Sequence, residues 1–252
     1  MTTHTALITG GTGGLGTAFA RALHDSGYTV LVTHLPQENP QAWLAQQAAE
    51  GYTFKAYPVD VSDFDSAQAL AQTVQADGYV VDVLVNNAGI TRDASFKKMT
   101  KQAWDEVMGV NLDSMFNMTK AFIEGMLAKK WGRIINIASI SGIAGNFGQA
   151  NYASTKAGIT GFTKTLALEF ASKGITVNSI SPGFFRTNMT AAIPADVMNN
   201  VLLPKIPVGR LGEPEELAGL VAFMASEKAG FLTGAKDDQN IIRGFTLERG
   251  MK

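Results

Sequence analysis

Short apolar runs alternate with longer segments of helical periodicity along most of the chain. The apolar runs predict strands over residues 5–9, 29–33, 54–58, 82–86, 133–138 and 175–180. Apolar positions at helical spacing predict helices over about 14–26, 41–50, 63–76, 101–129 and 150–172. This β-α-β-α order predicts an α/β fold, a doubly wound parallel sheet with helices on both faces and right-handed crossovers. Because no linker or internal repeat interrupts the pattern, we expect residues 1–252 to form a single domain.

Composition narrows the class of partner. With 252 residues, 46% of them hydrophobic and 17% charged, the chain can bury a sizeable core. Its formal net charge of -1 and pI near 6.3 give no overall attraction to phosphate backbones. We therefore expect a small-molecule partner, no nucleic acid and no membrane.

The absence of cysteine excludes disulfides, thiol nucleophiles and cysteine-ligated metals, and it fits a reducing compartment. The three histidines, His4, His24 and His34, are scattered, so we expect no metal site. The N-terminus enters an apolar strand without a basic flank, and no run of about 18 apolar residues occurs. These features predict a cytoplasmic protein.

A glycine-rich turn, residues 9–16 (Thr-Gly-Gly-Thr-Gly-Gly-Leu-Gly), joins the first predicted strand to the first predicted helix. Two glycine spacings fit a dinucleotide-binding turn, one through positions 11, 13 and 16 and the other through positions 10, 14 and 16. Glycines there let the backbone turn tightly and approach a pyrophosphate at the helix N-terminus. The turn predicts a Rossmann-type nucleotide site, with close packing of strand and helix as the alternative explanation.

The end of the second predicted strand decides which nicotinamide cofactor binds. An NAD site usually has an acidic residue there to hold the ribose diol, and none occurs between residues 25 and 38. A cation for the 2′-phosphate of NADP is also missing, because no Lys or Arg occurs between residues 21 and 55. We expect NADP(H) to be favoured over NAD(H), with Thr33, His34 and Gln37 as polar contacts.

Tyr152 and Lys156 lie four residues apart in a predicted helix, and Ser139 precedes them in the chain. Residues four apart share a helix face, so the Lys156 ammonium can sit beside the Tyr152 hydroxyl. A nearby cation favours the phenolate, so we expect Lys156 to lower the pKa of Tyr152. Tyrosine and lysine pairs at this spacing also occur where both side chains only pack and reach water, so the pair needs support from other motifs.

That support comes from six motifs whose order resembles the short-chain dehydrogenase/reductase family over roughly residues 5–235. They are the glycine turn, Asp60-Val61, residues 86–89 (Asn-Asn-Ala-Gly), Asn111, the group of Ser139, Tyr152 and Lys156, and Pro182-Gly183 with Thr187. Singly, each has an ordinary explanation as a cap, turn or loop. The cofactor contacts that the resemblance implies are Gly10, Thr12, Gly14, Leu15, Gly16, His34, Asp60, Val61, Asn87, Ala88, Gly89, Tyr152, Lys156, Pro182, Gly183 and Thr187.

The resemblance implies a catalytic tetrad of Asn111, Ser139, Tyr152 and Lys156. Tyr152 would donate its proton to a carbonyl oxygen as hydride arrives at the carbon, or accept it in reverse. Ser139 would polarise that oxygen. Lys156 would also hold the nicotinamide ribose, and Asn111 would anchor a water that relays protons from Lys156 to solvent.

Four segments, residues 89–93, 96–100, 130–134 and 146–152, are more similar to acetoacetyl-CoA reductases than to 3-oxoacyl-carrier-protein reductases. The former make (R)-3-hydroxybutyryl-CoA for polyhydroxybutyrate synthesis, so the resemblance implies a short 3-oxoacyl-CoA substrate. The substrate contacts that it implies are Asp93, Ser139, Phe147, Gln149, Tyr152 and Phe185.

Two alternatives stay open. One is the same chemistry on a carrier-protein thioester or on another ketone or alcohol. The other is a non-catalytic nucleotide-binding protein, which the intact tetrad disfavours. A basic cluster of Arg92, Lys97, Lys98 and Lys101 would suit either anionic acyl carrier, and it would equally suit a solvated face.

Residues 236–252 depart from the family's pattern. The family usually ends with a strand after a Thr-Gly turn and a glycine-rich tail at a subunit interface. Thr233-Gly234 is present, but the tail of 17 residues carries 7 charges, and only residues 240–242 suggest a short strand. We hypothesise a divergent C-terminus or a shifted reading frame, which leaves the tetrad intact but puts the last strand and the implied homo-tetramer in question.

Overall fold

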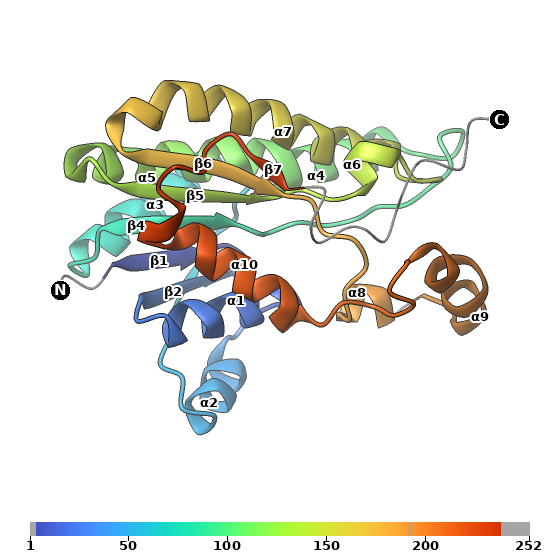
Figure 1. Cartoon of the computed structure of the whole chain (residues 1–252), viewed down its shortest axis with the longest axis horizontal. Coiled ribbons are helices and arrows are strands. Elements are labelled where there is room, and N and C mark those ends of the chain that lie inside the picture. The colour runs from blue at the N-terminus through green and yellow to red at the C-terminus, as the bar shows by residue number, and fades with distance from the viewer. Residues whose placement is uncertain (1–3, 192, 238–252) are drawn as a thin grey trace.

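Seven parallel strands form the centre of the protein, in the spatial order β3-β2-β1-β4-β5-β6-β7 (Figure 1). The computed structural model describes residues 4–191 and 193–237. The strands are β1 (Thr5–Ile8), β2 (Thr29–His34), β3 (Lys55–Pro58), β4 (Val81–Asn86), β5 (Gly132–Ile137), β6 (Ile175–Ile180) and β7 (Lys236–Asp237). The chain builds the sheet outward from β1 in one direction and then, from β4, in the other. The predicted doubly wound parallel sheet is confirmed.

The register of the central strands brings their carboxyl ends to one edge. Ile8 of β1 pairs with Val32 of β2 on one side and with Val85 of β4 on the other. The residues that follow these three positions therefore meet at the point where the strand order reverses. In open α/β sheets, ligands bind in the crevice outside this edge.

Every central strand is buried on both faces, because its apolar residues alternate between two cores. In β1, Ala6 and Ile8 belong to the core under α1 and α10, while Leu7 belongs to the core under α3, α5 and α7. The same alternation separates Val83 from Leu84 in β4. Continuous apolar strands of this kind are typical of parallel sheets covered on both sides.

The helices form one layer on each face of the sheet, with α3, α5 and α7 above it and α1 and α10 below it in Figure 1. The two short helices α8 and α9 lie beyond the carboxyl edge of the strands. The bounds of the α-helices are α1 (Gly14–Asp25), α2 (Gln41–Ala49), α3 (Phe64–Ala76), α4 (Lys101–Met108), α5 (Ser114–Lys129), α6 (Ser141–Ala144), α7 (Ala150–Phe170), α8 (Asn188–Ala191), α9 (Ala195–Val197) and α10 (Pro214–Ala225).

Local chemistry explains several helix ends. The Asp63 carboxylate accepts a hydrogen bond from the Ser66 amide at 2.8 Å and caps α3. Thr100 caps α4 in the same way through the Ala103 amide. At α10, Pro214 occupies the first turn, where its missing N–H removes no helical hydrogen bond.

The helices expected over residues 101–129 are confirmed as α4 and α5, with the π-helical turn Gly109–Asp113 between them. The structure differs from the sequence prediction in two places. The long helix α10, which packs against α1, was not predicted. The last strand does form, as the two residues of β7 beside β6, while the strand suggested at residues 240–242 lies outside the described residues.

Candidate active site

The turn between β1 and α1 requires glycine at particular positions. Gly10 has φ +60°, a left-handed conformation that favours glycine. A Cβ on Gly16 would collide with the Gly10 carbonyl oxygen, and a Cβ on Gly14 would lie 3.3 Å from Thr187 Cβ. A Cβ on Gly13 would meet only ordinary contacts. Of the two spacings that fitted the sequence, the one through positions 10, 14 and 16 is therefore the one in which every glycine has a steric reason.

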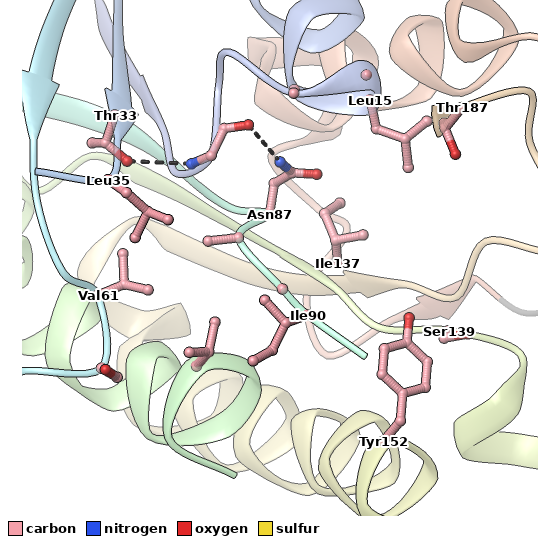
Figure 2. Close-up of a pocket in the computed structure, with 18 of the residues that line it drawn as sticks. Leu15, Thr33, Leu35, Val61, Asn87, Ile90, Ile137, Ser139, Tyr152 and Thr187 are labelled. Atoms are coloured by element: carbon pink, nitrogen blue, oxygen red, sulfur yellow. Dashed lines mark hydrogen bonds between the residues drawn. The ribbon is translucent and has the colours of Figure 1, made fainter. Parts of the chain in front are cut away.

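Hydrogen bonds tie this turn to the ends of the neighbouring strands. Thr33 Oγ1 accepts from the Gly10 amide at 3.2 Å, and the Gly11 amide donates to the Thr33 carbonyl at 3.0 Å. On the other side, Asn87 Nδ2 donates to the carbonyl oxygens of Thr9 and Gly10. Figure 2 shows the Thr33–Gly10 and Gly10–Asn87 bonds in sequence. The turn is thus held in place by Thr33 of β2 and by Asn87, the residue after β4.

A cavity of about 720 Å³ opens at this edge of the sheet. It extends from Leu35 and Val61 at one end to Ser139 and Tyr152 at the other (Figure 2). All of the cofactor contacts implied by the sequence line it, namely Gly10, Thr12, Gly14, Leu15, Gly16, His34, Asp60, Val61, Asn87, Ala88, Gly89, Tyr152, Lys156, Pro182, Gly183 and Thr187.

The cavity fits a dinucleotide in size and in chemistry. Its volume lies within the range of roughly 300–1,000 Å³ that ligand pockets occupy. The first turn of α1 faces it behind Gly13, which has no side chain to cap the helical amides. Such amides suit a pyrophosphate. Because a Cβ at Gly14 or Gly16 would crowd the turn, the glycines shape a cradle for close backbone approach.

Tyr152 and Lys156 lie in the first two turns of α7, at the end of the cavity opposite Leu35. The Tyr152 hydroxyl points into the cavity beside Ser139 (Figure 2), close enough for Ser139 to influence the pKa of the phenol. The Ser139 hydroxyl also accepts from the Ser141 amide at 3.2 Å, which fixes its position. The arrangement presents two hydroxyl groups to one reacting oxygen.

Burial sets the acidity of both groups on α7. It raises the pKa of Tyr152, with a further increase from Asp93, while the hydrogen bond from Ser139 acts to lower it. Burial also lowers the pKa of Lys156 to about 8, because the side chain is only 4% exposed.

The expected lowering of the Tyr152 pKa by Lys156 is not seen in this arrangement. The Lys156 ammonium donates to the Ile137 carbonyl at 2.7 Å and lies 5.5 Å from the centroid of the Tyr152 ring. It is therefore directed at the end of β5 rather than at the phenol oxygen. The helical spacing predicted that Tyr152 and Lys156 lie on one face of α7. The Lys156 ammonium, however, forms its hydrogen bond with the backbone at the end of β5.

Asn111 lies behind the cavity wall, fully buried in the π-helical turn between α4 and α5. Its Oδ1 accepts from the Ile90 amide at 2.8 Å and its Nδ2 donates to the Ile90 carbonyl at 2.9 Å. A Cβ placed on Gly89 would come within 3.3 Å of Asn111 Oδ1 and 3.6 Å of Lys156 Nζ. The structure thus brings Asn111 and Lys156 to the same short stretch of the loop after β4.

The substrate contacts implied by the sequence divide into two groups. Ser139, Tyr152 and the buried Phe185 line the cavity. Phe147 does not, because its side chain is 90% exposed on the loop between α6 and α7. Gln149 and Asp93 also lie outside the lining.

A polar network joins Gln149 and Asp93 at the rim. Gln149 Nε2 donates to the Asp93 carboxylate at 2.9 Å, and its Oε1 accepts from Ser141 Oγ at 3.0 Å. The Ala94 amide donates to the Gly148 carbonyl at 2.9 Å and joins the two loops along their backbones. The rim is therefore one connected unit beside Tyr152.

These motifs and this geometry match one known family. The sequence profile described as short chain dehydrogenase matches residues 4–197, more than half of the chain. The chain belongs to the short-chain dehydrogenase family. The resemblance seen in the sequence motifs is confirmed.

Known members of the short-chain dehydrogenase family resemble the chain over almost its whole length. Nodulation protein G of Azospirillum brasilense is 49% identical over 231 residues, which cover 91% of this chain and 94% of that protein. Acetoacetyl-CoA reductase of Cupriavidus necator is 48% identical over 236 residues, 93% of this chain and 96% of the relative. The 3-oxoacyl-(acyl-carrier-protein) reductase FabG of Vibrio cholerae is 43% identical over 229 residues, 91% of this chain and 92% of the relative.

No helix within the described residues has the length and apolar character to cross a membrane. Among the same residues, no three His, Asp or Glu side chains group in a way that could hold a metal ion.

Several residues that line the cavity were not predicted as site residues. Ile90 and Ile137 add apolar surface, Thr190 accepts from the Thr187 amide, and Glu38 reaches the cavity from beyond β2. No local motif marks them. In the sequence, Glu38 is only the first acidic residue after Asp25. The position of its carboxylate near the end of β2 depends on how the loop folds.

Proposed function

We propose that this protein is a nicotinamide-dependent reductase that converts acetoacetyl-CoA, a short 3-oxoacyl-CoA, to the (R)-3-hydroxyacyl-CoA. The observation that carries the proposal is that one continuous cavity is lined both by the glycine cradle and by Tyr152 and Ser139. The substrate follows from the acetoacetyl-CoA reductases among the relatives, which are 46–48% identical over more than nine-tenths of the chain.

A bound nicotinamide would exchange hydride with the carbon of the substrate carbonyl. The chain's own residues act on the carbonyl oxygen. Tyr152 donates its proton to that oxygen as negative charge develops, and its raised pKa keeps the phenol protonated at neutral pH. Ser139 donates a second hydrogen bond to the same oxygen, which stabilises the developing charge.

Lys156 and Asn111 help to replace the proton that Tyr152 donates. With a pKa of about 8, Lys156 can lose and regain a proton near neutral pH. Its Nζ and Asn111 Oδ1 both face Gly89, so a water held between them could return a proton toward Tyr152. Because Asn111 is pinned by two hydrogen bonds to Ile90, this position is fixed.

A carrier-protein thioester is the second candidate substrate, and it rests on the FabG relative that is 43% identical. The basic cluster beside the rim changes this comparison little. Within this cluster of four, Arg92 pairs with Glu106 at 2.7 Å and Lys101 pairs with Asp105. The other two members, Lys97 and Lys98, are exposed and form no ion pair with the described residues. Two lysines suit the phosphates of coenzyme A and acidic carrier residues alike.

The proposal extends to the setting of the enzyme. The reaction would supply the monomer for polyhydroxybutyrate synthesis, and the absence of cysteine is compatible with the cytoplasm. We also propose a homo-tetramer, as the family resemblance implies. The short β7 gives the sheet the edge strand that the charged tail had put in question.

A spectrophotometric assay tests the proposal. Acetoacetyl-CoA is supplied with NADH and with NADPH, and the decrease in absorbance of the reduced nicotinamide is followed alongside an acetoacetyl-carrier-protein substrate. We expect the CoA thioester to give the higher kcat/KM and an (R)-configured product. Preference for the carrier protein would favour the second candidate, whereas cofactor binding without turnover on either would favour a non-catalytic protein.

A further inference from the structure

The end of the cavity near β2 carries negative charge. Glu38 follows β2 by four residues, yet the loop folds back so that its carboxylate accepts from the Leu35 amide at 3.1 Å. Glu38 and Leu35 both line the cavity. Asp60, at the end of β3, lines it as well, with its carboxylate accepting from the Ser62 amide and hydroxyl. Two acidic residues therefore line the cavity near the ends of β2 and β3.

No cation balances these carboxylates at that end, as far as the described residues show. The basic residues nearest in sequence are Arg21 and Lys55. Arg21 pairs with Glu50 at 2.7 Å and Lys55 with Asp77 at 2.7 Å, and neither lines the cavity. The cations that do line it, Arg92 and Lys156, come from the loop after β4 and from α7.

We infer that this cavity selects NAD(H) over NADP(H), and that Glu38 is the residue that decides the choice. The inference rests on the proposed function only in that a nicotinamide dinucleotide occupies the cavity. A carboxylate accepts hydrogen bonds from the two hydroxyls of the adenosine ribose, as the acid at the end of the second strand does in NAD sites. A 2′-phosphate would place a second negative group beside Glu38 with no cation to receive it.

The inference reverses the preference drawn from the sequence for a structural reason. The sequence showed no acid at the end of the second strand, because position 38 lies several residues beyond it. The hydrogen bond from Leu35 brings the Glu38 carboxylate back to the strand end. The premise that an acid is missing therefore does not hold in the folded protein.

Affinity measured without substrate tests this inference. NADH and NADPH are titrated into the purified full chain, and binding is followed by nucleotide fluorescence and by calorimetry. Repulsion between two charges a few Å apart near a surface is worth on the order of a tenfold change in affinity. We expect NADH to bind at least about tenfold more tightly than NADPH.

Two variants and a matched control identify the residue responsible. Glu38→Gln removes the charge and keeps the size, so it should weaken NADH and strengthen NADPH, narrowing the ratio of their dissociation constants several-fold. Leu35→Arg adds a guanidinium at the strand end and should favour NADPH further. Glu124→Gln, an exposed position on α5 that does not line the cavity, should leave both affinities unchanged.

Ionic strength provides a second readout. Because salt screens charge repulsion, the effect of Glu38→Gln on NADPH binding should shrink as salt is raised. Tighter binding of NADPH than of NADH by the wild-type chain would overturn the inference, and so would a Glu38→Gln variant with the wild-type ratio. Failure of the proposed function looks different, since NADH would then bind but acetoacetyl-CoA would not be reduced.

Discussion

Tyr152 combines a raised pKa with a hydroxyl that lies beside Ser139 at one end of the cavity. A protonated phenol at this position can donate its proton to a carbonyl oxygen on which negative charge develops. The reaction proposed for this protein uses only the hydroxyl group of the Tyr152 side chain. Removing the oxygen alone is therefore a clean test of its role.

We expect Tyr152→Phe to lower kcat by about 10²- to 10⁴-fold, the range typical of a lost general acid. NADH affinity should change little, because the glycine cradle and Glu38 are untouched. Single-turnover kinetics and fluorescence titration measure the two effects separately. Near-normal turnover in this variant would remove Tyr152 from the mechanism.

Lys156 gives stability a pH dependence of predictable sign. Its pKa is about 8 in the folded protein, against an ordinary value of 10.5. Between these values the unfolded chain binds a proton that the folded protein has released, so stability rises with pH through this window. Below pH 8 both states are protonated, and the folded protein bears the full cost of the buried ammonium.

Comparison with Lys156→Met isolates this effect from other titrating groups. The free energy of unfolding of the wild-type protein, relative to that of the variant, should rise by about 2–3 kcal/mol between pH 8 and pH 10.5. Urea unfolding of both proteins without cofactor at several pH values provides the measurement. Parallel curves would show that the ammonium is not buried as described.

At the scale of elements, the turn from β1 to α1 depends on the absence of side chains. Gly16→Ala would place a methyl group against the Gly10 carbonyl oxygen and displace the turn. We expect a loss of about 1–3 kcal/mol of stability and at least a tenfold weaker affinity for NADH. Urea unfolding and nucleotide titration report the two quantities.

Gly161→Ala is the matched control. Gly161 lies exposed within α7, and a Cβ there would meet nothing within 4 Å. Alanine at such a position should stabilise the helix by about 0.5–1 kcal/mol without changing nucleotide affinity. Equal behaviour of the two variants would mean that the steric account of the turn is incorrect.

Asn151 connects α7 to two neighbouring elements. Its side chain is fully buried and donates to the carbonyl oxygens of Arg92 and Ala103, both at 3.1 Å. Its Oδ1 accepts from the Tyr152 amide at 2.8 Å. The residue before the proton donor thus holds the start of α7 against α4 and the rim loop.

We expect Asn151→Ala to cost about 1–3 kcal/mol of stability, because it leaves buried carbonyl groups without donors. It should also lower kcat while leaving KM for NADH near its wild-type value, since Tyr152 would no longer be fixed. Ser154→Ala, one turn along the exposed side of α7, is the control and should affect neither. A variant that lost stability but kept full kcat would limit Asn151 to a structural role.

For the whole molecule, the sequence predicted what depends on local pattern. The alternation of apolar runs with helical spacing predicted the parallel sheet and the helices on both of its faces. The glycine turn and the Tyr152–Lys156 spacing marked two separate stretches of the lining of one cavity. Two side-chain positions could not be predicted, because each depends on a backbone group of another residue. The Lys156 ammonium donates to the Ile137 carbonyl, and the Glu38 carboxylate accepts from the Leu35 amide. Helix α10 was missed because its residues are apolar on almost every side.

Assembly is the remaining property of the whole molecule. Phe64 on α3 and Phe116 on α5 stack with ring centroids 6.0 Å apart, and both stay partly exposed in the single chain. Apolar surface of this kind suits contact with a second copy. We expect a native mass near four times 26.8 kDa by light scattering. A monomer would contradict the proposed homo-tetramer and direct attention to residues 236–252.

Gly14 and Thr187, which nearly touch across the cofactor cradle, lie far apart along the chain. During synthesis on the ribosome, the first strand and its turn emerge long before the segment that closes over them. A nascent chain that ends before this segment cannot form the complete cradle, however well its early strands pair. Nucleotide binding should therefore appear late in synthesis, and in a cell it would report that nearly the whole domain has folded.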